Sequence, residues 1–224
     1  LQAKRKYPWK NIITLIEAGQ MDVKRCFAIM LKMARDVLYV GEITQPREVG
    51  ELINASLRLN SGVGATLHSI SPYEVITNLR NLMLRTDMYD KADIAEADIA
   101  RGLDLIFHLA KLPSGRIVVE YVVEVEYIDQ DAYIREVNEG PLHDRWMSFL
   151  KLAQMALSKY MYSKAYKYNT IIRFDRKSET FIPVDLPSDQ YFAKMRKYQT
   201  QADVDEYVEF YKQEKEKHKD FKGF

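Results

Sequence analysis

Two short apolar runs, each followed by polar residues, constrain the fold of this chain more than any other feature. The first run, Val37–Val40, precedes Gly41-Glu42, and the second, residues 65–67, precedes His68. The first is too short and too uniformly apolar for a surface helix, so it is predicted to be a buried parallel strand. The second is predicted to be the next strand of the same sheet.

The segment between the two strands has the pattern of an amphipathic helix. Thr44 and Pro46 indicate its start, because proline is tolerated in a first turn where its missing N–H costs no hydrogen bond. Gly62 and Gly64 interrupt the pattern before the second strand. The apolar positions of this helix recur three and four residues apart, at Val49, Leu52, Ile53 and Leu57. Strand, helix and strand together predict an α/β fold with a parallel sheet.

In such a sheet, Glu42 and His68 follow neighbouring strands and are expected at the same edge. Ligands of open α/β sheets bind at the carboxyl ends of the strands. A carboxylate there can orient or deprotonate a water molecule for attack on a γ-phosphate, or hold Mg²⁺ through water. A histidine there can contact the γ-phosphate and sense its loss. The structural alternatives are a Glu42 that caps the helix after Pro46 and a His68 that only makes hydrogen bonds within the fold.

Further elements are predicted on both sides of this unit. Asp22 is a suitable N-cap for a helix with apolar residues at three- and four-residue spacing. Ser71 and Glu74 have the spacing of a capping box at the start of another helix. The acidic, alanine-rich segment 87–100 predicts a short helix.

Strands are predicted over residues 103–109 and 116–128, where the second alternates Val and Tyr with Glu. The Pro-Ser-Gly turn between them indicates a hairpin at a sheet edge.

The character of the chain changes after Gly140-Pro141. A helix is predicted over 145–166, a second hairpin over 170–174 and 180–184, and a last amphipathic helix near the end. The sequence therefore predicts an α/β domain over residues 1–140 and a mostly helical extension with one hairpin over residues 141–224.

Composition excludes several classes of function. The 224 residues are 47% hydrophobic and 29% charged, as is usual for one soluble globular core. A net charge of +1 gives no electrostatic argument for binding nucleic acid or a membrane surface. Cys26 is the single cysteine, which excludes a disulfide within the chain and favours a reducing compartment. No apolar run approaches the roughly 18 residues of a membrane span, and no metal-ligand spacing or nucleophilic triad is present.

The two strand-end motifs resemble the Walker B box and the histidine box of the type II/type IV secretion ATPases, the motors of secretion, conjugation and pilus systems. The resemblance covers roughly residues 7–185 and is densest over 21–84. Residues 21–36 are similar to the family's helix before Walker B, and Gly115-Arg116 with residues 117–125 is similar to its later strands. The Tad-pilus and conjugation branch is the more similar one.

The resemblance implies a partial RecA-like P-loop NTPase fold that lacks the phosphate-loop strand-helix unit and carries a C-terminal, mostly helical extension. It implies an ATPase that uses ATP and Mg²⁺, works as a homo-hexamer, and docks on inner-membrane platform proteins at the cytoplasmic face of the cell membrane. Glu42 and His68 are then the expected catalytic residues. Thr66 and Arg47 are expected to contact the nucleotide, and no resident metal ligand is expected.

Several departures from the family pattern bear on activity. None of the 9 glycines precedes a lysine, so the phosphate loop G-x-x-x-x-G-K-[ST] is absent from these residues and is expected upstream of Leu1. Thr44 stands where the family has Arg in Gly-Glu-x-Arg, although Arg47 lies one turn on. Asn60 and Asn78 replace a usual His and Arg. The chain alone is therefore predicted not to hydrolyse ATP or to bind it tightly.

The sequence leaves two alternatives open. The chain could be a non-catalytic scaffold or assembly relative that has lost the nucleotide, as the substitutions at Thr44, Asn60 and Asn78 suggest. Residues 141–224 could instead form a docking module whose Tyr-rich helices face a membrane platform.

Overall fold

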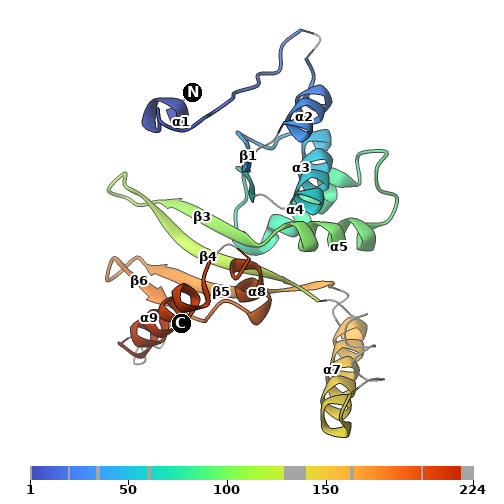
Figure 1. The fold of residues 1–224 in the computed structure, drawn as a ribbon, viewed down its shortest axis with the longest axis vertical. Helices are drawn as coiled ribbons and strands as arrows, with labels where there is room; N and C mark the ends of the chain where they lie inside the picture. Colours follow the sequence, from blue (N-terminus) through green and yellow to red (C-terminus); the bar gives the residue numbers. More distant parts are fainter. Residues whose placement is uncertain are drawn as a thin grey trace.

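The computed structural model describes residues 2–19, 21–33, 36–59, 62–128, 140–161, 164–197 and 199–217. Asn60 lies outside these ranges. Within them the chain forms a mixed α/β fold with one parallel and one antiparallel sheet (Figure 1). No helix in the described ranges is long and apolar enough to cross a bilayer.

The predicted strand-helix-strand unit is present. Strand β1 (Val37–Val40) pairs in parallel with β2 (Gly62–Ala65), and α3 (Pro46–Arg58) connects them. The register places Tyr39 opposite Gly64. The second strand thus ends at Ala65, whereas the sequence predicted that it begins there. Gly64 makes room for Tyr39 in the strand, because a Cβ at Gly64 would lie 3.1 Å from the Tyr39 ring.

Helices cover one side of this sheet and form the main core. They are α2 (Val23–Lys32), α3, α4 (Val75–Met83) and α5 (Ala92–Gly102), with the short 3₁₀ turn η1 (Pro72–Glu74) before α4. The Asp22 cap is confirmed, because its carboxylate accepts the Arg25 N–H at 2.8 Å. The core continues from these helices into the antiparallel sheet, and its most buried members include Leu38, Val49, Ile53, Ile76, Met83, Ile99 and Val123.

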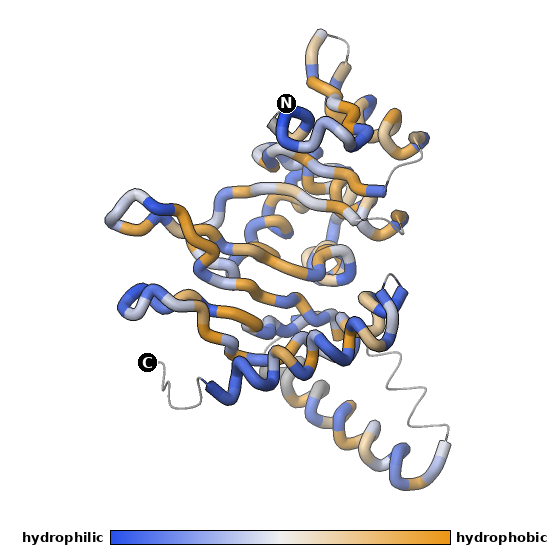
Figure 2. Tube along the Cα trace, turned by 60° about the vertical axis from the view of Figure 1, so that its left-hand side comes forward, coloured by the Kyte–Doolittle hydropathy of each residue, from blue (hydrophilic) through white to orange (hydrophobic). Residues whose placement is uncertain are grey.

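The antiparallel sheet has the order β3-β4-β5-β6. Its strands are β3 (Leu105–Lys111), β4 (Ile117–Tyr127), β5 (Tyr166–Asp175) and β6 (Thr180–Pro183). Both predicted hairpins are confirmed, but the pairing of β4 with β5 was not predicted. This pairing crosses the predicted boundary at residue 140, so residues 1–140 and 141–224 share one sheet. Figure 2 shows that apolar residues are concentrated along these central strands.

The remaining helices lie at the periphery. Helix α1 (Gln2–Lys6) precedes an extended segment, and α8 (Asp189–Met195) and α9 (Gln201–Lys217) lie beside β5 and β6 (Figure 1). Helix α7 (Leu142–Met161) projects away from the sheet. It ends before the predicted limit at residue 166, because Tyr166 is a buried member of β5.

Tyr89 predicts how the stability of this fold depends on alkaline pH. Burial first, and then the hydrogen bond to Asp98 and its charge, raise the pKa of Tyr89 from 10.0 to about 12. The folded chain therefore holds this proton more tightly than the unfolded chain. The contribution is fully present below pH 10 and is lost as the pH rises from 10 towards 12.

We expect the free energy of unfolding to fall over this alkaline window, and to fall less steeply in Tyr89→Phe. Asp98→Asn leaves Tyr89 buried but removes the neighbouring negative charge. The slope of its unfolding free energy against pH should therefore lie between those of wild type and Tyr89→Phe. Urea unfolding at a series of pH values, with tyrosinate absorbance recorded in parallel, measures these slopes. Equal slopes in wild type and Tyr89→Phe would contradict the prediction.

Candidate functional site

The candidate site is built on the two turns that leave β1 and β2. The Ile43 N–H donates to the Thr66 carbonyl at 2.8 Å, and the Thr66 hydroxyl donates to the Gly41 carbonyl. The Ile43 side chain is buried in the core, and this burial anchors the turn that follows β1. These bonds hold the two strand ends together just beyond the last paired residues, and so they position the side chains that follow.

Glu42 and His68 meet at this edge, as the sequence predicted. Nε2 of His68 lies 3.1 Å from Oε1 of Glu42. The two side chains are 94% and 53% exposed respectively, so both are open to solvent and to any ligand that approaches the sheet edge. Pairs with this exposure contribute at most about 1 kcal/mol to stability. The pair is therefore available for chemistry at little cost to the fold.

The segment after His68 is held against α4. The Ser69 hydroxyl donates to the Ser71 carbonyl at 2.8 Å and accepts from the Asn78 amide at 3.2 Å. Asn78, which replaces the expected Arg, thus fixes the turn that carries His68. Ser71 accepts the Tyr73 N–H at 3.3 Å and opens η1, so the predicted reciprocal capping box with Glu74 gives way to a 3₁₀ turn.

Of the two expected nucleotide contacts, Thr66 lies at the strand ends and Arg47 does not. The Thr66 hydroxyl proton is engaged by the Gly41 carbonyl, so this side chain links the two strand ends. Arg47 lies on α3 and lines a separate pocket. Within the described ranges, it makes no hydrogen bond or ion pair with Glu42 or His68.

The start of α3 follows the first strand end in the chain and lines this pocket. The Glu48 carboxylate accepts the backbone N–H groups of Thr44 at 2.6 Å and of Gln45 at 2.7 Å. Thr44, at the position where an Arg was expected, therefore presents its backbone rather than a cation. The carboxylate that caps α3 is therefore that of Glu48, whereas the structural alternative assigned this role to Glu42.

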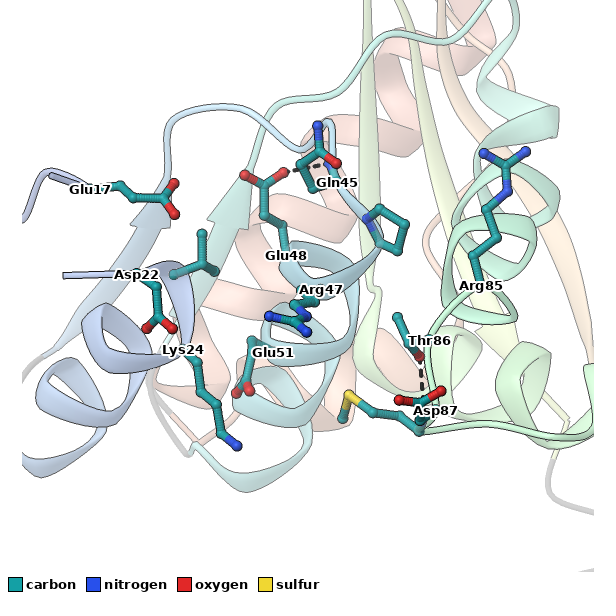
Figure 3. A pocket seen from close by; sticks show the side chains of 13 residues that line it. Glu17, Asp22, Lys24, Gln45, Arg47, Glu48, Glu51, Arg85, Thr86 and Asp87 are labelled. Atoms are coloured by element: carbon teal, nitrogen blue, oxygen red, sulfur yellow. Dashed lines mark hydrogen bonds between the residues drawn. The ribbon is translucent and has the colours of Figure 1, made fainter. Parts of the chain in front are cut away.

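The pocket has a volume of about 590 Å³ and lies between the start of α2, the start of α3 and the loop after α4 (Figure 3). Its walls carry charges of both signs, and Lys24, Arg47 and Arg85 make no ion pair with another described residue. The lining carboxylates are Glu17, Asp22, Glu48, Glu51 and Asp87. Asp22 and Glu48 already accept N–H groups at the starts of α2 and α3.

Sequence reasoning missed this pocket. Its walls come from three regions that are remote in the chain, around residues 17–24, 45–51 and 85–88. Lys24, Glu51 and Arg85 have no motif around them. Only the folded arrangement of α2, α3 and the loop after α4 brings them together. Within the described part of the chain, no cluster of three or more His, Cys, Asp or Glu side chains is suited to a metal ion.

No protein-family model and no curated protein matches this chain.

Proposed function

We propose that this chain is the C-terminal part of the RecA-like motor domain of a hexameric secretion, conjugation or pilus ATPase. The observation that carries the proposal is the contact between Glu42 and His68 at the carboxyl ends of adjacent parallel strands. The resemblance of the two surrounding motifs to the Walker B and histidine boxes supports it.

In this proposal Glu42 orients the water that attacks the γ-phosphate and accepts its proton. His68 donates a hydrogen bond to the γ-phosphate. Because His68 contacts Glu42, a γ-phosphate bound at His68 would compete with Glu42 for the imidazole. Arrival of the nucleotide would then free the carboxylate to bind water, and loss of the γ-phosphate would restore the pair.

The residues of this chain fit only part of a nucleotide site. The printed sequence has no glycine followed by lysine, so it supplies no phosphate cradle. The proposal therefore requires a phosphate loop from outside these residues. Mg²⁺ would be held by that loop and by the phosphates. Coupling of ATP turnover to substrate transfer or pilus assembly, on a platform at the inner membrane, belongs to the same proposal.

The alternative function is a non-catalytic scaffold with the same fold. It is favoured by two observations: one on Asn78, which replaces a family Arg, and one on Arg47, the possible substitute for the Arg that is missing at Thr44. Asn78 is engaged in holding the turn after β2, and Arg47 lies in the pocket instead of at the strand ends. Neither residue supplies a cation beside Glu42 and His68, where a transition state of phosphoryl transfer gathers negative charge.

The test is ATP hydrolysis by the protein that joins this chain to a phosphate loop. Glu42→Gln keeps the size of the side chain but removes its basicity, and we expect kcat to fall by about 100-fold or more. Glu74→Gln is the matched control, because Glu74 is an exposed glutamate in η1 and, within the described ranges, makes no ion pair with His68.

Unchanged kcat in Glu42→Gln would show that this carboxylate has no catalytic role. Wild-type protein that supports assembly or transfer without hydrolysing ATP would favour the scaffold. A fluorescent ATP analogue offered with Mg²⁺ to this chain alone should not bind tightly, since the cradle is missing.

A further inference from the structure

Helix α7 carries an apolar stripe that the described chain leaves uncovered. The helix projects from the end of the antiparallel sheet, away from the other helices (Figure 1). Its large apolar side chains on this face are half or more exposed: Leu142 68%, Trp146 58%, Phe149 50%, Leu150 54% and Leu157 69%. Together with Ala153 these residues are called the α7 stripe. A contiguous apolar stripe of this kind on a soluble domain marks an interaction surface.

The spacing of the α7 stripe is that of a helix-pairing seam. Leu142, Trp146, Phe149 and Ala153 follow one another at intervals of four, three and four residues. These intervals average about 3.7 residues, close to one helical turn, so the stripe stays on one face of α7 and can face a second helix along its length. The rings of Trp146 and Phe149 pack edge to face, with their centroids 5.9 Å apart, so these two side chains form one continuous aromatic surface.

The distribution of side-chain sizes selects the direction of the second helix. The bulky Trp146 and Phe149 lie in the first half of the helix, and the small Ala153 lies just past its middle. If two copies run antiparallel about a two-fold axis near Lys151, Phe149 and Leu150 of one copy lie against Ala153 of the other. Near the axis, large residues then face a small one, as in closely packed layers. A parallel pair would instead set Trp146 against Trp146 and Ala153 against Ala153.

The area of the α7 stripe suits such a pair. At roughly 200 Å² for a large apolar side chain, the exposed fractions amount to roughly 600 Å² per copy. A pair would then bury about 1,200 Å², which is at the lower end of the range for specific interfaces. Aromatic residues at the centre of the patch match the composition of interface cores.

We propose that α7 is a homodimerisation helix, in which two copies of this chain pair antiparallel through the α7 stripe. The contact is two-fold symmetric and uses the same surface on both copies, so it joins two chains and then closes. A ring of motor subunits needs a different, head-to-tail surface. The proposal is therefore independent of the proposed ATPase function and can hold or fail without it.

The first experiment measures the mass of the 224-residue chain in solution by light scattering over a range of concentrations. The wild type should be a dimer that dissociates on dilution. Leu150→Glu places a charge in the α7 stripe and should weaken the dimer at least about 30-fold. Met147→Glu is the matched control, because Met147 is exposed on the same helix but lies off the stripe. It should leave the dimer intact, and the melting temperatures of both variants show that the fold is retained.

The second experiment tests the direction of pairing by disulfide formation in a Cys26→Ser background. Trp146→Cys and Leu157→Cys are made separately and then mixed. In an antiparallel pair, position 146 of one copy faces position 157 of the other. The same position in the two copies is then separated by 11 residues along the helix axis, or about 16 Å. The mixture should therefore cross-link under oxidation, and each variant alone should not.

A chain that stays monomeric at every concentration would overturn the proposal, as would equal masses for Leu150→Glu and wild type. Cross-linking of each cysteine variant with itself would overturn the antiparallel arrangement. Capture of a monomeric chain by anionic lipid vesicles, abolished by Leu150→Glu, would assign the α7 stripe to a membrane surface instead.

Discussion

Arg80→Met is expected to lower the free energy of unfolding by about 3 to 5 kcal/mol, the cost of leaving a buried ion without its partner. Nη1 of Arg80 on α4 donates to Oε2 of Glu96 on α5 at 2.8 Å. Glu96 is only 5% exposed, and it lies where α4 and α5 pack together. Methionine fills a similar space but supplies no charge, so the Glu96 carboxylate would remain buried and uncompensated. Urea unfolding measures the difference.

Two further variants separate the ion pair from other effects of this substitution. Arg116→Met removes the ion pair between Arg116 and Glu179, two side chains that are 53% and 55% exposed. It should lower the free energy of unfolding by less than about 1 kcal/mol. The double variant Arg80→Met with Glu96→Leu removes both charges and should recover most of the stability lost in Arg80→Met. An Arg80→Met variant as stable as Arg116→Met would show that the buried pair contributes little.

The parts of the fold that were predicted correctly depend on local patterns. The helix from Pro46 follows from a first-turn proline and apolar residues at helical spacing. The hairpins follow from short turns between alternating strands, which pair with their nearest neighbours in sequence. The meeting of Glu42 and His68 follows from the same logic, because parallel strands joined by one helix end at the same edge.

The parts that were missed depend on contacts between remote segments. Strand β4 pairs with β5 across a long connection that includes the 20 residues of α7, and no pattern in either strand predicts this pairing. Tyr166 was assigned to a helix because the preceding residues are helical in period, yet its burial in the sheet overrides that tendency. The pocket beside Arg47 likewise exists only after α2, α3 and the loop after α4 have come together.

Buried charges were the hardest features to predict. Glu96 belongs to an acidic segment that resembles a solvated helix face, and Arg80 lies 16 residues away on another helix. Glutamates alternate along β4, but only Glu124 is enclosed. Burial of a single acidic residue within such a pattern is decided by what packs over it, which a periodicity does not reveal.

Glu124 is the second site where a large loss of stability is expected. The residue lies on β4 and is 2% exposed. Its Oε2 accepts the Ser188 N–H at 2.8 Å and the Asn169 amide at 3.1 Å, and its Oε1 accepts the Ser188 hydroxyl. Ser188 is also the N-cap of α8, where its hydroxyl accepts the Tyr191 N–H at 3.2 Å. A single buried carboxylate thus attaches the start of α8 to the sheet.

Glu124→Ala should therefore lower the free energy of unfolding by about 3 to 5 kcal/mol, because it leaves several buried donors unsatisfied and opens a cavity. Glu124→Gln preserves the shape and one acceptor oxygen, so it should cost only about 1 to 2 kcal/mol. The matched control is Glu126→Ala on the same strand, which removes the more exposed ion pair with Lys167 and should cost about 1 kcal/mol or less. Amide hydrogen exchange across α8 locates the effect: in Glu124→Ala, protection should fall first at the start of this helix. Uniform loss of protection over the whole chain would show that Glu124 supports the core in general and not the attachment of α8.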